Sequence, residues 1–406
     1  MDILDIVMNK KRAFPYYQPI ISADKQEITG YEVLGRFQKE DGEVISLGNF
    51  FHNPNTPEEY RLELDEHIQH QAFTTYLKEK RTDYLFINVD ANAITADGGE
   101  HFFENLSNYQ KQGLPFENIV LEIKEHEFEG DTSQLKHFIQ YVQSMRIKIA
   151  LDDVGKSTTH LDAIAFLEPD IIKVDLEFVE DHSFPSMFSD VLHSLSMLSR
   201  KIGASLLFER ISAFNQLNYA WRHGARYYQG FYLGKPKPQF LDKMSFAETL
   251  RKDFHHFLQF EKKKIEAQLD LVNTLSQRLQ EQLKQNKALN DIDKLTQNIA
   301  SALEDITFRV YICNHEGFQK SGNAVKDEEG NWQYRAEERN RNWSWRPYFL
   351  ENIIRMNYEK KGILSDLYTD IHREERIRTY SYPVNEELYV FLDIPYSYLY
   401  EKDFLI

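Results

Sequence analysis

The chain has 406 residues, of which 42% are hydrophobic and 14% aromatic, a composition that supports packed cores and argues against global disorder. Its formal net charge of −16 argues against a nucleic-acid polymer as partner, because such proteins need a basic face. The single cysteine, Cys313, rules out a disulfide within the chain and a cysteine-rich metal site. No stretch resembles a signal peptide or reaches the roughly 20 apolar residues of a membrane span, so we expect a cytoplasmic protein with no membrane span.

Short apolar segments alternate with helical patterns between residues 15 and 240. The strand-like segments are 84–89, 118–123, 147–151, 171–174 and 204–208, and the helical patterns include 58–78, 133–145 and 188–201. Such alternation predicts βα units around a parallel sheet, and strands that are mostly apolar suit a sheet buried on both faces. The length of the region is typical of a closed β/α barrel, so we expect an α/β fold with a TIM-like barrel over residues 1–245.

Residues 246–300 contain neither glycine nor proline and predict a long connecting helix. Their apolar positions recur in steps of three, four and seven, which places them on one helix face. These positions are Leu258, Ile265, Leu269, Val272, Leu275, Leu279 and Leu283. One interpretation is a surface helix packed on the barrel. We favour a coiled-coil connector that makes a homodimer, because the stripe persists beyond two heptads.

Residues 301–406 return to strand-like pieces at 308–313, 362–367, 377–382 and 388–393, separated by turns. They predict an α+β domain of about 100 residues.

Polar residues lie near the ends of the predicted strands of the first domain or directly after them, and Glu32 lies beside an earlier strand-like stretch. They are Glu32, Asn88, Glu122, Asp152, Asp153, Lys173 and Glu209. In a β/α barrel the carboxyl ends of the strands converge on one face, so several acids would meet there. Close carboxylates repel one another, and Mg²⁺ or Mn²⁺ would relieve that repulsion. Two such ions suit attack on a phosphodiester. For any single acid, capping a helix or facing solvent in a loop stays an alternative.

The same residues resemble the EAL phosphodiesterases of cyclic di-GMP over roughly residues 15–240. The signature Glu-Ala-Leu with its following arginine is present as Glu32-Val33-Leu34-Gly35-Arg36. Further matches are Ile87-Asn88-Val89, Glu122-Ile123-Lys124-Glu125, Leu151-Asp152-Asp153-Val154-Gly155, Ile172-Lys173-Val174 and Gln229-Gly230-Phe231-Tyr232. Several ordered matches are far more specific than a lone glycine motif.

The resemblance implies a role for each residue. Ligands of a first metal would be Glu32, Asn88, Glu122 and Asp152, with Asp152 and Asp153 holding a second. Lys173 would orient the attacking water, with a structural ion pair as the alternative, and Glu209 would be the general base. Arg36, Leu34 and Gln229 would contact cyclic di-GMP, and Glu125 would support a loop. The resemblance implies Mg²⁺ or Mn²⁺ as cofactor, with Ca²⁺ as an inhibitory ion that permits binding without turnover.

Three departures from the family pattern bear on activity. Ser157 replaces a glycine after the aspartate pair, Lys124 replaces a threonine, and Ser212 replaces a second glutamate after the base. Serine at a position that needs a positive φ would strain the loop. We therefore expect a phosphodiesterase that makes linear pGpG weakly or under regulation, with a catalytically inactive cyclic di-GMP receptor as the alternative.

The C-terminal part resembles the tail of YkuI-type EAL proteins, which has a PAS/Cache-like fold. The resemblance implies a sensor pocket for a small anionic or zwitterionic ligand, with Arg346, Tyr368 and Asp393 in its wall. The alternative is that Trp343 and Trp345 are core residues and that Arg346 forms a structural ion pair.

Overall fold

The computed structural model describes residues 3–96, 99–124, 128, 130–154, 161–176, 186–346, 349–371 and 373–402. The chain divides into two compact units, Met1–His255 and His256–Ile406, and helix α10 (Ala247–Gln285) begins in the first unit and continues into the second. Within the described part, no helix is both long enough and apolar enough to cross a bilayer.

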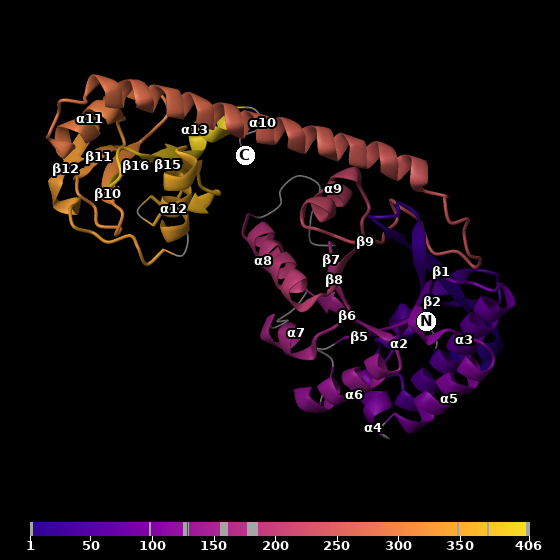
Figure 1. Ribbon diagram of the computed structural model, residues 1–406. Coiled ribbons are helices and arrows are strands. Elements are labelled where there is room, and N and C mark those ends of the chain that lie inside the picture. The colour runs from indigo at the N-terminus through magenta and orange to yellow at the C-terminus, as the bar shows by residue number, and fades with distance from the viewer. Residues whose placement is uncertain are drawn as a thin grey trace. The chain divides into compact units, whose positions relative to one another are not determined.

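Eight strands close into a ring in the first unit, as predicted for a TIM-like barrel (Figure 1). They are β1 (Ala13–Ser22), β2 (Ile28–Gln38), β4 (Tyr84–Asn88), β5 (Ile119–Ile123), β6 (Lys148–Val154), β7 (Ile171–Asp175), β8 (Ser205–Glu209) and β9 (Tyr227–Tyr228). Strand β1 runs antiparallel to both of its neighbours, whereas β2 and β4 to β9 are parallel to one another. The short β3 (Val44–Ser46) extends the sheet beyond β2.

Most helices of this unit lie around the outside of the ring (Figure 1). Those described are α1 (Ile3–Met8), α2 (Gly48–Phe51), α3 (Glu58–Lys78), α4 (Ala91–Ala96), α5 (Glu100–Lys111), α6 (Thr132–Ser144), α7 (Leu161–Leu167), α8 (Ser186–Ile202) and α9 (Phe214–Arg222). Helix α6 shows why such segments form: the Asp131 side chain accepts a hydrogen bond from the Ser133 N–H at its start, and Leu135, Ile139 and Val142 bury one face.

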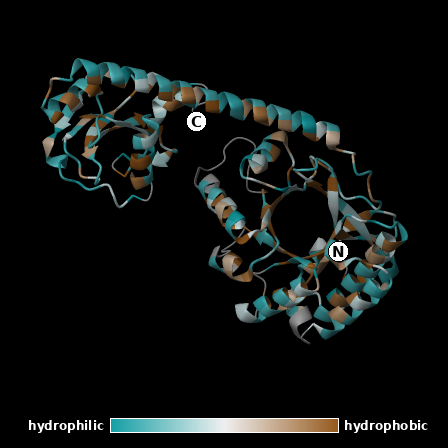
Figure 2. Cartoon of the chain, viewed as in Figure 1, coloured by the Kyte–Doolittle hydropathy of each residue, from teal (hydrophilic) through white to brown (hydrophobic). Residues whose placement is uncertain are grey.

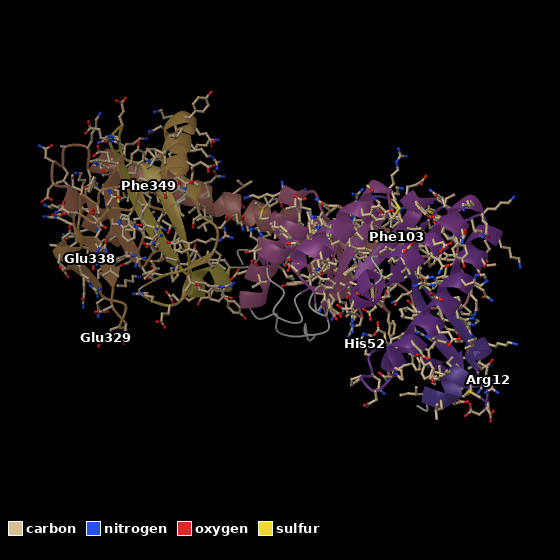
Figure 3. The ribbon with its side chains drawn as sticks, turned by 90° about the horizontal axis from the view of Figure 1, so that it is seen from below. Arg12, His52, Phe103, Glu329, Glu338 and Phe349 are labelled. Carbon is tan, nitrogen blue, oxygen red and sulfur yellow. The ribbon has the colours of Figure 1, made fainter. Side chains whose placement is uncertain are left out.

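The second unit is an α+β domain built on one antiparallel sheet. Its strands are β10 (Arg309–Asn314), β11 (Asn323–Lys326), β12 (Trp332–Arg335), β13 (Ile363–Leu364), β14 (Tyr368–Thr369), β15 (Arg376–Pro383) and β16 (Leu388–Pro395). Alternate residues of β10 and β16 pack against α11 (Ile292–Ala302) and the end of α10 on one face. The residues between them pack against α12 (Phe349–Glu359) on the other face, where Phe349 is labelled in Figure 3. Helix α13 (Tyr396–Glu401) follows β16.

The two halves of the apolar stripe of α10 lie in different environments. Figure 2 shows α10 as largely hydrophilic, with hydrophobic residues recurring along it. Leu275 and Leu279 are fully buried in the core of the C-terminal domain, while Leu258, Ile265 and Leu269 are more than half exposed. The second half of the stripe packs on the antiparallel sheet, so only the first half of the predicted coiled-coil interface stays exposed. Any partner helix could reach only the first half.

Candidate functional site

The predicted strand-end residues lie one layer above the apolar filling of the barrel. Side chains alternate along a strand with a period of two, so a residue two positions after an inward-facing one also faces inward. The pairs of filling and site residue are Phe86 and Asn88, Val120 and Glu122, Ala150 and Asp152, Ile171 and Lys173, and Leu207 and Glu209. Because the parallel strands end at the same mouth, these polar side chains meet there.

The mouth opens into a cavity of about 710 Å³, within the range of small-molecule sites. Its wall includes Glu32, Leu34, Arg36, Asn88, Glu122, Asp152, Asp153, Lys173, Glu209 and Gln229. The structure thus brings together the predicted metal-binding, catalytic and ligand-binding residues of the barrel. Glu125, the predicted loop-supporting residue, lies outside the described residues, as does Ser157.

Lys173 lies at the centre of the carboxylates. Its Nζ is 2.9 Å from Glu122, 3.1 Å from Asp152, 3.2 Å from Glu209 and 3.8 Å from Glu32, and its side chain is 1% exposed. Burial alone would lower the pKa of Lys173, but the surrounding carboxylates raise it well above its usual value. The surrounding carboxylates therefore stabilise the charged form of Lys173.

Two amides fix the Glu32 carboxylate from opposite sides. Asn88 Nδ2 donates to Oε1 at 3.0 Å, and Gln229 Nε2 donates to Oε2 at 2.6 Å. The residue after Gln229 is Gly230, with φ of 155°, and a Cβ there would lie 2.1 Å from the carbonyl oxygen of Ile211. Only glycine fits, so this glycine lets the chain bring Gln229 to the site.

One ammonium does not neutralise the acids around it. Burial, and then the neighbouring Glu32, raise the pKa of Glu122, while burial raises the pKa of Glu209 to about 8. Glu122 Oε2 is buried and finds no hydrogen-bond donor among the described residues. Asp152, Asp153 and Glu209 each place a carboxylate oxygen within 4.8 Å of the others. A buried, under-compensated set of oxygen ligands fits hard divalent cations.

The two aspartates sit at an irregularity in β6. The pairing of β6 with β7 shifts between Leu151 and Val154, and Asp153 has a φ of 57°. The shift turns both carboxylates toward the mouth, where strict alternation would send one of them outward. Lys124 Nζ lies 3.1 Å from Asp153 Oδ2.

Ser212 makes contacts of its own in place of the glutamate that the family resemblance expects. Its backbone N–H and its hydroxyl donate to Gln216 Oε1 at 2.7 and 2.9 Å, ahead of helix α9. This short side chain lines the cavity with a hydroxyl, not a carboxylate.

The wall also contains residues that sequence reasoning missed. Asp65 and Gln69 of α3 line the cavity; Gln69 Nε2 donates to Asp65 Oδ2 at 2.8 Å, and burial raises the pKa of Asp65 to about 7. Phe231 also lines it, although this residue is 62% exposed. The sequence marks Asp65 only by its position: it is an acid next to Leu64, and Leu64 and Ile68 belong to the buried face of the helix.

The C-terminal domain has a small cavity of about 30 Å³ between its sheet and α12. Arg346 and Tyr368 line it, and the Arg346 guanidinium lies over the rings of Trp343 and Tyr368 at 4.8 and 5.7 Å. Asp393 is fully buried behind the wall, 2.5 Å from Arg309 Nε. It accepts a hydrogen bond from Thr379, whose hydroxyl also contacts the Tyr368 hydroxyl at 2.6 Å.

Comparison with known proteins gives matches along the whole chain. Residues 2–236 match a family model described as the EAL domain, and residues 240–406 match one described as an EAL-domain associated signalling protein domain. The chain is 45% identical to the uncharacterized EAL-domain containing protein YkuI of Bacillus subtilis (strain 168) over 100% of both chains. The crystal structure of YkuI, in complex with substrate c-di-GMP and calcium, matches with a TM-score of 0.94 over 100% of both chains. A probable cyclic di-GMP phosphodiesterase of Escherichia coli (strain K12), PdeB, is 25% identical over 56% of this chain and 43% of its own length.

Proposed function

The chain belongs to the EAL-domain family, and from this premise we propose that it binds cyclic di-GMP and hydrolyses it slowly to linear pGpG with the help of divalent cations. The observation that carries the proposal is the ring of carboxylates around Lys173 at the mouth of the barrel. The relative YkuI, which matches along the full length, holds c-di-GMP and calcium in its crystal structure.

The donor set suits two cations. Glu32, Asn88, Glu122 and Asp152 would hold the first, and Asp152 with Asp153 the second. When bound, Mg²⁺ or Mn²⁺ would stabilise the charge that develops on the phosphoryl oxygens.

The other residues of the site would bind the ligand and act on the attacking water. Arg36 reaches the cavity with its guanidinium anchored by Gly35 O and over the ring of Tyr16, which leaves donors for a phosphate of the ligand. Leu34 and Gln229 complete this contact surface. Lys173 orients the attacking water and Glu209 takes a proton from it as the water oxygen bonds to phosphorus. One bond from phosphorus to a ribose oxygen breaks, and the leaving oxygen takes up a proton. Lys173 and Glu209 lie on neighbouring strands, β7 and β8.

A catalytically inactive receptor is the second candidate, and two observations favour it. Ser212 offers a hydroxyl where a carboxylate would hold metal more firmly, and Lys124 pairs with Asp153. If slow turnover arises from poor organisation of the second metal, the double substitution Ser157→Gly and Ser212→Glu should raise turnover with little change in affinity for cyclic di-GMP. A repaired variant that is no faster than the wild type favours the receptor.

For the C-terminal part we propose a PAS/Cache-like sensor domain of residues 301–406, joined to the barrel by the helical connector 246–300. The cavity beside Arg346, at about 30 Å³, has room for about one water molecule, so a small anionic or zwitterionic ligand would require its wall to open. Arg346, which lies among aromatic rings, would then pair with the carboxylate of the ligand. A panel of small acids and amino acids should contain one that raises the melting temperature of the wild type but not of Arg346→Ala. If no compound does so and Arg346→Ala only unfolds the domain, Arg346 is a core residue.

We also propose that the chain is a homodimer, supported by the exposed apolar positions Leu258, Ile265 and Leu269. Light scattering at micromolar concentration should give twice the chain mass of 48.1 kDa. A monomer mass at that concentration contradicts the proposal.

The function of the barrel is tested by incubation with cyclic di-GMP and either Mg²⁺ or Mn²⁺, followed by separation of the products. Mn²⁺ should give the higher activity, because Mg²⁺ demands near-ideal octahedral geometry. Binding measured by calorimetry in Ca²⁺ should show the ligand bound without turnover. No heat and no thermal shift at high ligand concentration would refute the binding proposal.

A further inference from the structure

Lys124 places a fixed positive charge beside the position of the second cation. We propose that the Lys124 ammonium acts as a built-in competitor of that cation, so that the barrel binds one divalent ion tightly and a second one weakly. This inference rests on the proposed cation-dependent function and identifies one residue that weakens binding of the second cation.

The fold brings Lys124 to this position directly. Lys124 follows the last residue of β5, Ile123, which pairs with Leu151 of the neighbouring parallel strand β6. Two residues beyond Leu151, the irregularity in β6 turns the Asp153 carboxylate toward the mouth, where its Oδ2 lies 3.1 Å from Lys124 Nζ. The two side chains are 20% and 13% exposed, so water screens the pair less than it would at an open surface.

His52 holds the ammonium in place from the other side. Its Nε2 lies 2.8 Å from Lys124 Nζ, and its Nδ1 lies 2.8 Å from the carbonyl oxygen of Gly48. An ammonium can only donate and a carbonyl can only accept, so His52 Nδ1 carries the proton and Nε2 accepts. His52, which follows α2 and is labelled in Figure 3, is thus a neutral positioning residue for Lys124.

The two lysines of the site have different effects on a cation. Lys173 faces Glu32, Glu122, Asp152 and Glu209, and this excess of negative charge leaves the first cation position attractive. Lys124 instead offsets the negative charge of the Asp153 carboxylate, and this carboxylate would be a ligand of the second cation. A divalent ion bound there would lie within a few ångströms of a like charge. It must therefore displace Lys124 or bind without the full strength of Asp153.

Mn²⁺ titration of the full chain, followed by calorimetry and by the electron paramagnetic resonance of free Mn²⁺, tests the proposal without any nucleotide. The wild type should bind one Mn²⁺ at least tenfold more tightly than a second. Lys124→Met removes the charge but keeps the length of the side chain, and it should tighten the second site at least tenfold while changing the first less than threefold. His52→Phe, which removes the acceptor of Lys124, should tighten the second site by a smaller factor.

Lys136→Met is the matched control, since it removes a lysine that pairs with Glu168 at 2.7 Å in the same domain but away from the cavity. It should leave both Mn²⁺ affinities unchanged. Lys124→Thr repeats the test if the methionine variant does not fold. The inference is overturned if the wild type already binds two Mn²⁺ equally well, or if neither Lys124 variant tightens the second site. Binding of cyclic di-GMP in Ca²⁺, measured in parallel on the same proteins, tests the proposed function separately. If none of the proteins binds cyclic di-GMP, the proposed function fails, but the comparison of their Mn²⁺ affinities still tests the role of Lys124.

Discussion

Replacing Lys173 by methionine tests whether one buried ammonium offsets the charge of the acids around it. Its Nζ lies 2.9 to 3.2 Å from Glu122, Asp152 and Glu209, and its side chain is 1% exposed. Removing one partner of a buried ion pair costs about 3–5 kcal/mol, because the other charge stays buried without compensation. Methionine preserves most of the side-chain volume, so packing adds little to this cost. The metal-free variant should lose about 3–5 kcal/mol of its free energy of unfolding.

Thermal unfolding of the chelator-treated proteins near neutral pH, followed by circular dichroism, measures the loss. In a domain of this size each kcal/mol corresponds to roughly 2–4 °C, so the melting temperature of the barrel should fall by roughly 6–20 °C. Added Mn²⁺ should recover part of the fall, because a bound cation supplies positive charge and stabilises only the folded state. Lys136→Met, which breaks an ion pair with an exposed partner, should cost less than about 1 kcal/mol. An equal, small shift in both variants would show that the carboxylates do not depend on Lys173.

Three further predictions concern the same site. Glu209→Gln should abolish pGpG formation while leaving the affinity for cyclic di-GMP within about threefold of wild type, because it removes the general base and keeps the ligand contacts. Product analysis beside calorimetry distinguishes this result from a general loss of binding. Gly230→Ala should lower the free energy of unfolding by at least about 2 kcal/mol, since its Cβ would lie 2.1 Å from the Ile211 carbonyl oxygen, and a variant with wild-type stability in urea would contradict the close contact. The raised pKa of Glu209 stabilises the metal-free fold at low pH, an effect lost as the pH rises from about 4.5 through about 8, and the raised pKa of Glu122 acts in the same direction. A cation needs Glu122 deprotonated, so Mn²⁺ binding should tighten with rising pH and release protons; calorimetry in buffers of different ionisation enthalpy that shows no proton release would refute this.

The core of the site could be predicted from sequence because it depends on local rules. Asn88, Glu122 and Glu209 end or nearly end apolar strands, and strands of a parallel barrel all deliver their carboxyl ends to one mouth. A strand order with β1 antiparallel to its neighbours does not change this, because β2 still runs parallel to β4 and presents Glu32 at the same mouth.

Other features depend on contacts between distant segments and could not be predicted in the same way. The pairing of Lys124 with Asp153 requires the shifted register of β6, which no pattern in the residues indicates. Asp65 faces the cavity only because α3 packs on the barrel with that edge toward the mouth. In the C-terminal domain, Asp393 was expected in the pocket wall with Arg346, and it lies behind that wall, joined to it through Thr379.

We propose that this barrel is a cation-dependent site where cyclic di-GMP is bound and slowly opened. The most direct measurement incubates the purified full chain with cyclic di-GMP and Mn²⁺ over hours and quantifies linear pGpG by chromatography, beside Glu209→Gln under the same conditions. We expect slow accumulation of pGpG by the wild type, none by Glu209→Gln, and none by the wild type when Ca²⁺ replaces Mn²⁺. Intact cyclic di-GMP after prolonged incubation with the wild type, or equal pGpG from Glu209→Gln, would contradict it.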